Sequence, residues 1–395
     1  MFEITGKYTT AKVMIDQVEE TCVAQITKMV NHPAFTNPVV IMPDTHAGSG
    51  SVIGFTMRAS EMIISNVVGV DIGCGVLSMD VTKHFEDISN EGLLKLNAEI
   101  RRSVPLGFHL HSTAKEGLNK DFLDWVNEEL VQASRNCPEL FKKSPKEYTS
   151  SNLAQLCENI GTTVGAVRLS VGTLGGGNHF IELSKSGVTN RLWLTIHSGS
   201  RNFGLRICNY WQKRAQQLPD QSKDLAVLVG EDAQDYLEDM ILAQCFAQLN
   251  RATMASQILN DKLLPKDGID TIHNFIDPRD GIIRKGAVTA FKGEELVVPL
   301  NMRDGMLICR GKGNEEWNQS APHGAGRRLA RGEAKRQLSL TDFQTQMQGI
   351  VSTSVNQETL DEAPNAYKDS ATIMELIPPT VEILDVVKPI LNIKA

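Results

Sequence analysis

Four of the nine histidines lie in short turns rich in Gly, Ser or Asn, and each turn is a separate polar motif. The turns are Gly177-Asn178-His179, His197-Ser198-Gly199-Ser200-Arg201, His273-Asn274 and His323-Gly324-Ala325-Gly326-Arg327, and Asp71-Ile72-Gly73-Cys74-Gly75 lies upstream of them. A structural histidine usually sits in an apolar segment, whereas a histidine that binds metal or attacks phosphorus needs an open backbone around it. The pattern predicts a metal and phosphate site assembled from distant parts of the chain.

Short apolar runs end at or next to these motifs, and they are typical of buried strands. They cover residues 39–42, 67–70, 192–196 and 306–309, whereas residues 91–102, 121–134 and 231–259 have the apolar spacing of helices. Because strands and helices do not alternate regularly, we expect an α+β fold with a sandwich-like sheet core and inserted helices. Since no Pro/Gly/Ser linker divides the chain, we predict one catalytic domain over residues 1–395, with a helical insertion at about 205–265.

Length and charge limit the class of protein. With 395 residues, of which 41% are hydrophobic, the chain can bury a large core. Its net charge of -7 excludes nucleic-acid binding by bulk positive charge, so any RNA contact must be local. A basic run that begins at Arg284 and Lys285 and continues from Arg327 to Arg336 could form a phosphate track, although such runs are more often solvated helix faces.

The seven cysteines are scattered without paired spacing, which argues against a disulfide framework and favours a reducing compartment. The N-terminus does not resemble a secretory signal, and the sequence contains no apolar stretch of about 18 residues. We therefore expect a soluble, cytoplasmic protein that does not bind membranes.

Two motifs offer metal or phosphate ligands. Asp71 and Cys74 lie three residues apart in a glycine loop, where a carboxylate and a thiolate can reach one divalent cation and the thiolate can bridge two. A buried cysteine packed in a glycine turn is the simpler alternative. Residues 172–182 form a glycine-rich turn that could cradle phosphate, but the turn lacks the lysine and hydroxyl of a Walker loop.

Two histidines have basic neighbours. Arg201, which follows His197, favours an anionic ligand, and a structural role for this histidine stays open. His323 has glycines that clear space around the ring and Arg327 to hold a phosphoryl group. A neutral imidazole can attack phosphorus and form a labile phosphoramidate, but the residues alone leave nucleophile, ligand and structural roles equally open.

Taken together, the motifs resemble those of the RtcB-type RNA ligases, which join RNA 3′-phosphate or 2′,3′-cyclic phosphate ends to 5′-OH ends. The similar strings occur in order from about residue 40 to the C-terminus, at residues 42–48, 69–75, 172–182, 197–201, 284–288, 323–327 and 363–369. The resemblance implies a GTP-dependent ligase with the RtcB-like α+β fold and two Mn²⁺ ions, acting in RNA repair or splicing. Its implied partners are RNA and, where the enzyme needs one, an activator protein.

The resemblance also assigns roles to residues. It implies that Asp71, Cys74, His179, His197 and His273 are metal ligands and that His323 is the nucleophile that accepts GMP. The implied guanylate contacts are Asn178, His179, Phe180, Ile181, Glu182, His273, Asn274, Pro299, Leu300, Asn301, Met302, Met306, His323, Gly324, Ala325, Gly326 and Lys394. Arg201, Lys285 and Arg327 are the implied RNA or phosphate contacts.

The chain departs from the commoner family pattern at two places. Met306 stands where better-known members carry a serine, and a thioether cannot donate the hydrogen bond of a hydroxyl. The stretch around Thr45 and Ala47 is also a variant form, which favours a side branch of the family. A metal-dependent phosphoesterase that acts on RNA ends without guanylylation is the alternative function, and His46 with Asp44 beside it is the one further histidine of interest.

Overall fold

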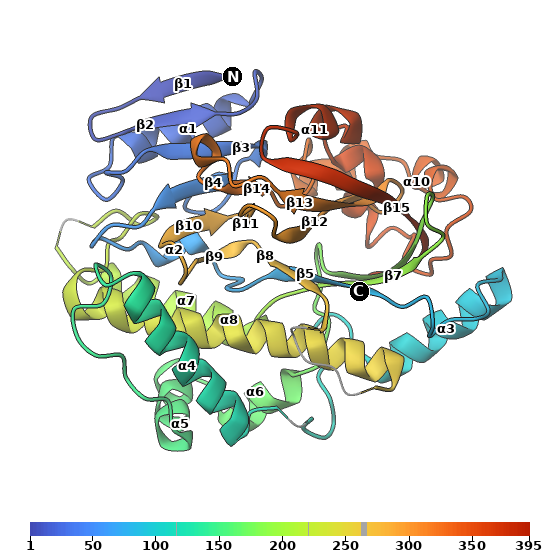
Figure 1. Ribbon diagram of the computed structural model, residues 1–395, viewed down its shortest axis with the longest axis horizontal. Helices are drawn as coiled ribbons and strands as arrows, with labels where there is room; N and C mark the ends of the chain where they lie inside the picture. The colour runs from blue at the N-terminus through green and yellow to red at the C-terminus, as the bar shows by residue number, and fades with distance from the viewer. Residues whose placement is uncertain (116, 220, 262–266) are drawn as a thin grey trace.

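Two large β-sheets form the centre of the computed structural model, which describes residues 1–115, 117–219, 221–261 and 267–395 (Figure 1). The first sheet has the strand order β1-β2-β3-β4-β10-β9, and the second has the order β12-β13-β15-β6-β7-β5-β8. A small third sheet pairs β11 with β14. All neighbours in these sheets are antiparallel except β2 and β3, which agrees with the predicted α+β class.

The strands are β1 Phe2–Thr5, β2 Thr10–Val13, β3 Val39–His46, β4 Ile53–Arg58, β5 Gly75–Asp80, β6 Phe180–Ser186, β7 Leu192–Ser198, β8 Ile269–Ile272, β9 Asn274–Ile276, β10 Ile282–Lys285, β11 Ala287–Thr289, β12 Glu295–Asn301, β13 Gly305–Gly311, β14 Ser320–Pro322 and β15 Val381–Ile393. The α-helices are α1 Glu20–Val30, α2 Ser65–Val68, α3 Asn90–Ser103, α4 Lys120–Asn136, α5 Ser150–Asn159, α6 Val164–Ser170, α7 Arg201–Ala215, α8 Gly230–Leu259, α9 Arg331–Gln337, α10 Leu340–Gln346 and α11 Ser370–Leu376. Short 3₁₀ turns are η2 Glu315–Trp317, η3 Leu360–Glu362 and η4 Pro364–Ala366.

The helix α8 is the central helical element, and α4 to α7 gather around it on one side of the sheets (Figure 1). Nineteen of its 30 residues are buried, because its apolar side chains point in nearly all directions rather than along one stripe. Its residues take part in both large apolar clusters, one with β2, β3, β4, α1, α4 and α7 and the other with β5, β6, β7, β15 and α3. This helix therefore ties the two sheets to one core.

Most of the predicted elements are confirmed, and one is wrong. The runs at 39–42, 192–196 and 306–309 lie in β3, β7 and β13, and the three predicted helices correspond to α3, α4 and α8. The run at 67–70, predicted as a strand, instead forms the end of α2 and the loop after it. Val67 and Val68 are buried as expected, but a four-residue apolar run does not distinguish a helical turn from a strand.

The region predicted as a helical insertion contains most of α7 and α8, although residues 220 and 262–265 of it lie outside the described residues. Whether it is an insertion, and whether residues 1–395 are one catalytic domain, stays a prediction. All seven cysteines are unpaired and buried, in agreement with the absence of a disulfide framework. Among the described helices, none combines the length and apolar character needed to cross a bilayer.

Candidate metal centre and active site

The seven-stranded sheet brings four of the predicted metal ligands together. Cys74 comes directly before β5 and His179 directly before β6, whereas His197 lies near the end of β7 and His273 directly after β8. Because β7 and β8 run antiparallel to β5, and β6 to β7, the ends of β7 and β8 meet the starts of the other two strands at one edge. In the register of the sheet, His197 lies opposite both Val76 and Phe180.

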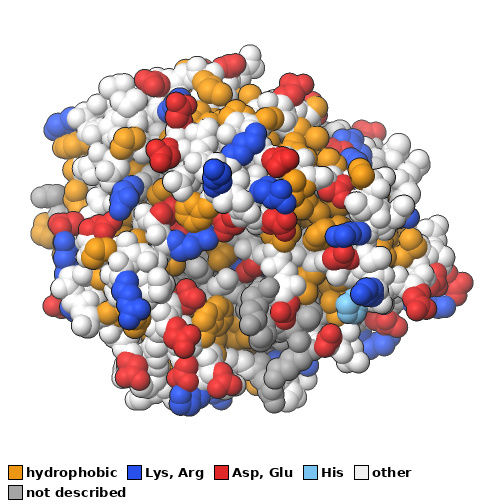
Figure 2. Space-filling view, viewed as in Figure 1, with side chains coloured by type: hydrophobic (Ala, Val, Ile, Leu, Met, Phe, Trp, Pro, Cys, Tyr) orange, Lys and Arg blue, Asp and Glu red, His pale blue; other side chains and the backbone are white. Residues whose placement is uncertain are grey.

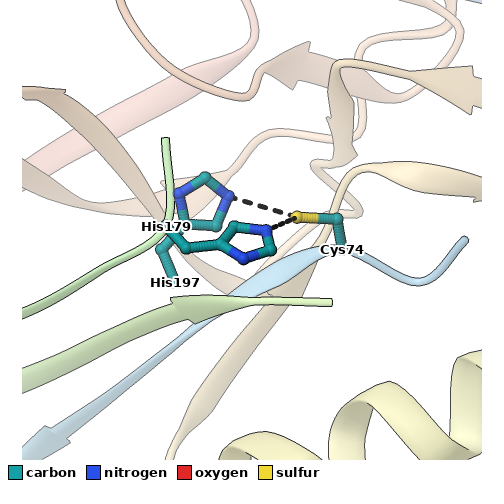
Figure 3. Close-up of side chains that lie close together, drawn as sticks. All are labelled: Cys74, His179 and His197. Atoms are coloured by element: carbon teal, nitrogen blue, oxygen red, sulfur yellow. Dashed lines mark hydrogen bonds between the residues drawn. The ribbon is translucent and has the colours of Figure 1, made fainter. Parts of the chain in front are cut away.

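The ligand atoms of these residues face one another. Figure 3 shows the rings of His179 and His197 directed at the sulfur of Cys74, with distances from Sγ to the two Nε2 atoms of 3.5 and 3.3 Å. The Nε2 atom of His197 is also 3.3 Å from Nε2 of His273, and His179 Nε2 is 2.9 Å from the Asp71 carboxylate. All five predicted ligands therefore form one continuous cluster.

These side chains are suited to a divalent cation. Ligand atoms bonded at about 2.1–2.3 Å to a tetrahedral ion are roughly 3.4–3.8 Å apart, close to the spacing between the sulfur and the two nitrogens. The Nδ1 atom of His179 lies 2.9 Å from the Leu174 carbonyl, so it carries the proton and leaves Nε2 free as a ligand. Nδ1 of His273 is buried and has no hydrogen-bond partner among the described residues, which leaves one more nitrogen available.

Burial sets the protonation of the cluster. Burial, together with the facing imidazoles, lowers the pKa of His197 and of His273 well below the ordinary value, so both rings are neutral near pH 7. Burial, together with the Asp71 carboxylate, raises the pKa of the Cys74 thiol well above its ordinary value. Neutral imidazoles bind metal directly, whereas the thiol must lose its proton when a cation binds.

Two buried residues of α8 hold the loops that carry the ligands. Asn250 accepts hydrogen bonds from the backbone of residues 172 and 173 and donates to the Gly199 carbonyl. Arg251 donates to the carbonyls of Gly73 and Ser198 at 2.9 and 2.8 Å and pairs with Asp270. The helix therefore fixes the loops on both sides of the metal cluster.

Gly199 is required by the close approach of Asp71. A Cβ atom at this position would lie 2.0 Å from Oδ1 of the Asp71 carboxylate, far inside van der Waals contact. A side chain at this position would push the carboxylate away from its place beside His179. The glycine that the sequence places after His197-Ser198 thus serves the neighbouring ligand rather than its own turn.

His323 lies beside this cluster and is oriented by a buried carboxylate. Its Nδ1 is 2.6 Å from Oδ2 of Asp44, which is completely buried, and its ring centroid is 4.9 Å from that of His273. This is the only hydrogen bond of the ring to any described residue. The carboxylate therefore holds the proton on Nδ1 and leaves the lone pair of Nε2 available.

The peptide that carries Asp44 is itself held in place. Lys368 donates to the carbonyls of Pro43 and Thr45, on either side of Asp44. Gly326 has a φ of +74°, and a Cβ there would lie 2.0 Å from the Asp44 carbonyl oxygen. The turn after His323 is thus packed against the strand that supplies its carboxylate partner.

A cavity of about 720 Å³ opens over the metal cluster and His323. Its lining includes Asp71, Cys74, His197, His273 and His323 together with many of the predicted guanylate contacts, namely Asn178, Phe180, Glu182, Asn274, Pro299, Leu300, Asn301, Met302, Gly324, Ala325, Gly326 and Lys394. The volume suits a nucleotide. Cavity and cluster form one site.

Two of the predicted guanylate contacts direct their side chains into the apolar core. Ile181 belongs to the cluster around β5, β6 and β7, and Met306 packs with Val76 and Val297. The Met306 sulfur accepts the hydroxyl hydrogen bond of Thr195 at 3.4 Å. The thioether thus has a structural role here, and its side chain is not part of the cavity lining.

The C-terminal lysine and two glutamates line or border the cavity. Lys394 donates to Glu362 at 2.7 Å and to the Asn178 carbonyl at 3.2 Å, and its ammonium lies 5.6 Å from the centre of the Phe180 ring. Burial alone would raise the pKa of Glu362, but Lys394 and two arginines lower it to about 2. Burial raises the pKa of Glu182 to about 7, although Ser184 and Asn392 donate hydrogen bonds to it.

The three predicted phosphate cations all have partners within the protein. Arg201 donates to the Gly107 carbonyl at 2.7 Å, and Lys285 donates to the carbonyls of Ser49 and Asn66. Burial lowers the pKa of Lys285 to about 8. Arg327 lies on the cavity wall, where it pairs with Glu362 at 3.2 Å.

The basic run predicted from the sequence is not one continuous surface track. Arg284 is completely buried and pairs with Asp277 and Asp280. On the face shown in Figure 2, basic and acidic side chains are interspersed. The exposed arginines of the cavity wall are Arg328 and Arg331, and Arg331 is paired with Asp361 and Glu362.

The sequence did not reveal how several site residues act. Asp44 had been paired with His46, but its carboxylate binds His323, and only its backbone carbonyl contacts the His46 ring. Asn250 and Arg251 appeared only as part of a helical pattern, and Glu362 had no local signal. The Pro43-Asp44 pair could have pointed to Asp44, because a carboxylate at the end of an apolar run is unusual.

Comparison with known proteins identifies relatives over nearly the full chain. A family model described as tRNA-splicing ligase RtcB matches residues 25–395. The chain is 30% identical to the RNA-splicing ligase RtcB of Escherichia coli K12, over 95% of both chains. It is 27% identical to RNA-splicing ligase RtcB2 of Escherichia coli ATCC 25922, over 95% of this chain and 93% of that protein. It is 26% identical to the tRNA-splicing ligase RtcB of Nanoarchaeum equitans, over 92% of this chain and 88% of that protein.

Proposed function

Because this chain belongs to the RtcB family and is an RNA ligase, we propose that it joins RNA 3′-phosphate or 2′,3′-cyclic phosphate ends to 5′-OH ends at the expense of GTP. The cofactor in this proposal is Mn²⁺, bound as two ions. One observation supports the proposal above the others: the Asp44 carboxylate holds Nδ1 of His323 at 2.6 Å, beside a cluster of metal-binding side chains. An imidazole oriented in this way is a nucleophile.

The proposed reaction begins at His323. Nε2 attacks the α-phosphorus of GTP, the bond to the bridging oxygen breaks, and pyrophosphate leaves, so that a His323-GMP phosphoramidate forms. The ring gains positive charge as the new bond forms, and the Asp44 carboxylate stabilises that charge. Since Asp44 is completely buried, water does not screen the interaction.

The second and third steps transfer the guanylate and seal the RNA. An oxygen of the RNA 3′-phosphate attacks the phosphorus of the phosphoramidate, the P–N bond breaks, and His323 is regenerated. The RNA 5′-OH then attacks the activated 3′-phosphate, GMP leaves, and a 3′,5′-phosphodiester remains. A 2′,3′-cyclic phosphate end is first opened by hydrolysis to a 3′-phosphate.

In this proposal Asp71, Cys74, His179, His197 and His273 would hold the metal. Bound Mn²⁺ supplies positive charge that neutralises phosphate oxygens and makes phosphorus more electrophilic. Thiolate and imidazole ligands bind zinc more tightly than manganese in the usual order, so the preference for manganese rests on the family.

The guanylate would occupy the cavity over His323. Asn178, Phe180 and Glu182 line it from β6 and the loop before it, and residues 299–302 line it from β12 and the turn after it. The carboxyl of Glu182, with its raised pKa, can accept or donate a hydrogen bond to a purine. Lys394, which is paired with Glu362, also lines the cavity.

Covalent labelling tests the proposal. The protein is incubated with Mn²⁺ and GTP labelled at the α-phosphate and then analysed on a denaturing gel; the expected band is labile in acid and stable in base. His323→Ala should abolish the band and retain metal, whereas Cys74→Ala should lose both. The matched control is His84→Ala, an exposed histidine beyond the far end of β5 that should label normally.

Failure of the proposal has a defined signature. If metal-loaded protein forms no band but hydrolyses cyclic-phosphate RNA without GTP, the enzyme is a phosphoesterase. If His323→Ala still labels, the nucleophile is another residue. Assays with tRNA fragments and with other cleaved RNAs then decide between splicing and repair. The same assays with and without cell extract show whether an activator protein is needed. Cell fractionation tests the cytoplasmic location.

A further inference from the structure

A fully exposed phenylalanine lies on an anchored turn next to the proposed active site. Phe108 has a relative exposure of 103%, the highest of the large hydrophobic side chains in the described part of the chain. The turn that carries it is closed by a hydrogen bond of 3.1 Å from the His109 amide to the Leu106 carbonyl, with Gly107 at a φ of +62°. Single exposed apolar side chains are common on soluble proteins, so what distinguishes this ring is its place on a turn bound to the site.

The turn is fixed to the loop that carries His179. The Gly107 amide donates to the Gly175 carbonyl at 2.9 Å, and the Leu174 amide donates to the Pro105 carbonyl at 3.0 Å. Arg201 donates to the Gly107 carbonyl at 2.7 Å. The exposed ring therefore stands on a backbone that is tied to the metal cluster.

The turn also lies between two segments of the cavity wall. Gly107 approaches Ala395, since a Cβ on Gly107 would be 3.7 Å from the Ala395 Cβ, and the preceding Lys394 lines the cavity. On the other side, the glycine loop leads to Asn178, which also lines the cavity. The turn that carries the ring is therefore close to two residues of the cavity wall.

An arginine of the cavity wall, which is paired with Asp361 and Glu362, lies near the loop to which this turn is bound. Arg331 lines the cavity and is about half exposed, and its guanidinium lies 3.5 Å from a Cβ built on Gly177 of the same glycine loop. Next to Phe108 on the turn, the side chain of His109 is also exposed. Exposed aromatic rings are the side chains on which proteins stack unpaired nucleotides.

We propose that Phe108 is a stacking platform for an unpaired nucleobase of the RNA strand whose end enters the cavity. This inference rests on the proposed function, because it specifies how the RNA substrate is bound. The stack holds the strand near its end and does not depend on base identity, since every base offers a π-face. Phe108 takes no part in guanylylation of His323.

The test uses full-length protein and single-stranded oligonucleotides with 2-aminopurine near a 3′-phosphate or a 5′-OH end. Wild type should quench the fluorescence on binding. Phe108→Ala and Phe108→Leu should lose the quenching and bind RNA about tenfold more weakly, whereas Phe108→Tyr should retain both. All variants should label with GTP as wild type does. Val188→Ala, which truncates another highly exposed apolar side chain at the far end of β6, is the matched control.

The outcomes separate this inference from the proposed function. Equal RNA affinity and quenching in wild type and Phe108→Ala overturn the stacking role, and the ring then serves a different partner such as a protein. Full binding by Phe108→Leu also overturns it, because leucine keeps apolar contact without a π-face. If wild type binds and quenches the RNA but does not ligate it, the proposed reaction fails and the stacking role stands; if wild type does not bind RNA, both fail.

Discussion

Replacing Asp44 by asparagine tests whether the carboxylate that orients His323 is needed for its reactivity. The shape of the side chain is kept, but the negative charge is lost. Asp44 is completely buried, and its Oδ1 has no hydrogen-bond partner among the described residues. If the amide NH₂ turns towards His323, it donates to Nδ1 and the ring proton moves to Nε2. If the amide oxygen turns towards His323, the NH₂ group is buried without an acceptor.

The size of the effect follows from these two arrangements. A hydrogen bond to a charged group contributes about 1.5–3 kcal/mol, which corresponds to about a tenfold to hundredfold decrease in the rate of guanylylation. The first arrangement also removes the lone pair from Nε2, so the decrease should lie at or beyond the upper end. Metal binding should not change, because Asp44 is not a metal ligand in this arrangement.

The assay is the rate of labelling with α-labelled GTP at saturating Mn²⁺, together with thermal unfolding and metal content. Thr45→Val is the matched control, because this neighbouring hydroxyl is buried and has no hydrogen-bond partner in the described part of the chain. It should label at nearly the wild-type rate. A stable, metal-loaded Asp44→Asn protein that labels as fast as wild type would refute the role of the carboxylate.

Three further predictions follow from the site. Gly199→Ala should reduce the affinity for Mn²⁺ at least tenfold, because the added methyl group would overlap the Asp71 carboxylate. The control is Gly187→Ala, which has no atom within 4 Å of the added methyl group and should bind Mn²⁺ normally. Isothermal titration with Mn²⁺ compares the two variants. The affinity for Mn²⁺ should rise by about tenfold per pH unit between about pH 6 and 8, since burial raises the pKa of the Cys74 thiol and metal binding expels its proton. A Mn²⁺ affinity that does not change with pH would exclude thiolate ligation. Burial also raises the pKa of Glu182 from 4.5 to about 7, so between these pH values the folded protein holds a proton that the unfolded chain has lost, and the free energy of unfolding decreases as pH rises. Urea unfolding across this pH range should show a decrease of up to about 3 kcal/mol for wild type relative to Glu182→Gln. Parallel pH profiles of the two proteins would contradict this prediction.

The α+β class and most long elements could be predicted from local patterns. The helix α8 and the strands β3 and β7 have apolar stretches that can be recognised without tertiary contacts. The run at 67–70 could not be assigned, because its burial against the core says nothing about whether the backbone is helical or extended. Short elements are decided by their neighbours rather than by their own residues.

The chemistry that the chain can perform is already present in its amino-acid sequence. Thiol, imidazole and carboxylate groups in glycine-rich turns are chemical facts of the sequence, and their order along the chain carried the resemblance to the RtcB family. The tertiary structure alone decided which groups act together. Asp44 and His323 are 279 residues apart and meet because β3 and the turn after β14 pack against each other. Lys285 has the sequence context of a phosphate ligand, but its ammonium is buried against two backbone carbonyls. Burial and hydrogen-bond partners depend on contacts between distant segments, and no local pattern encodes them.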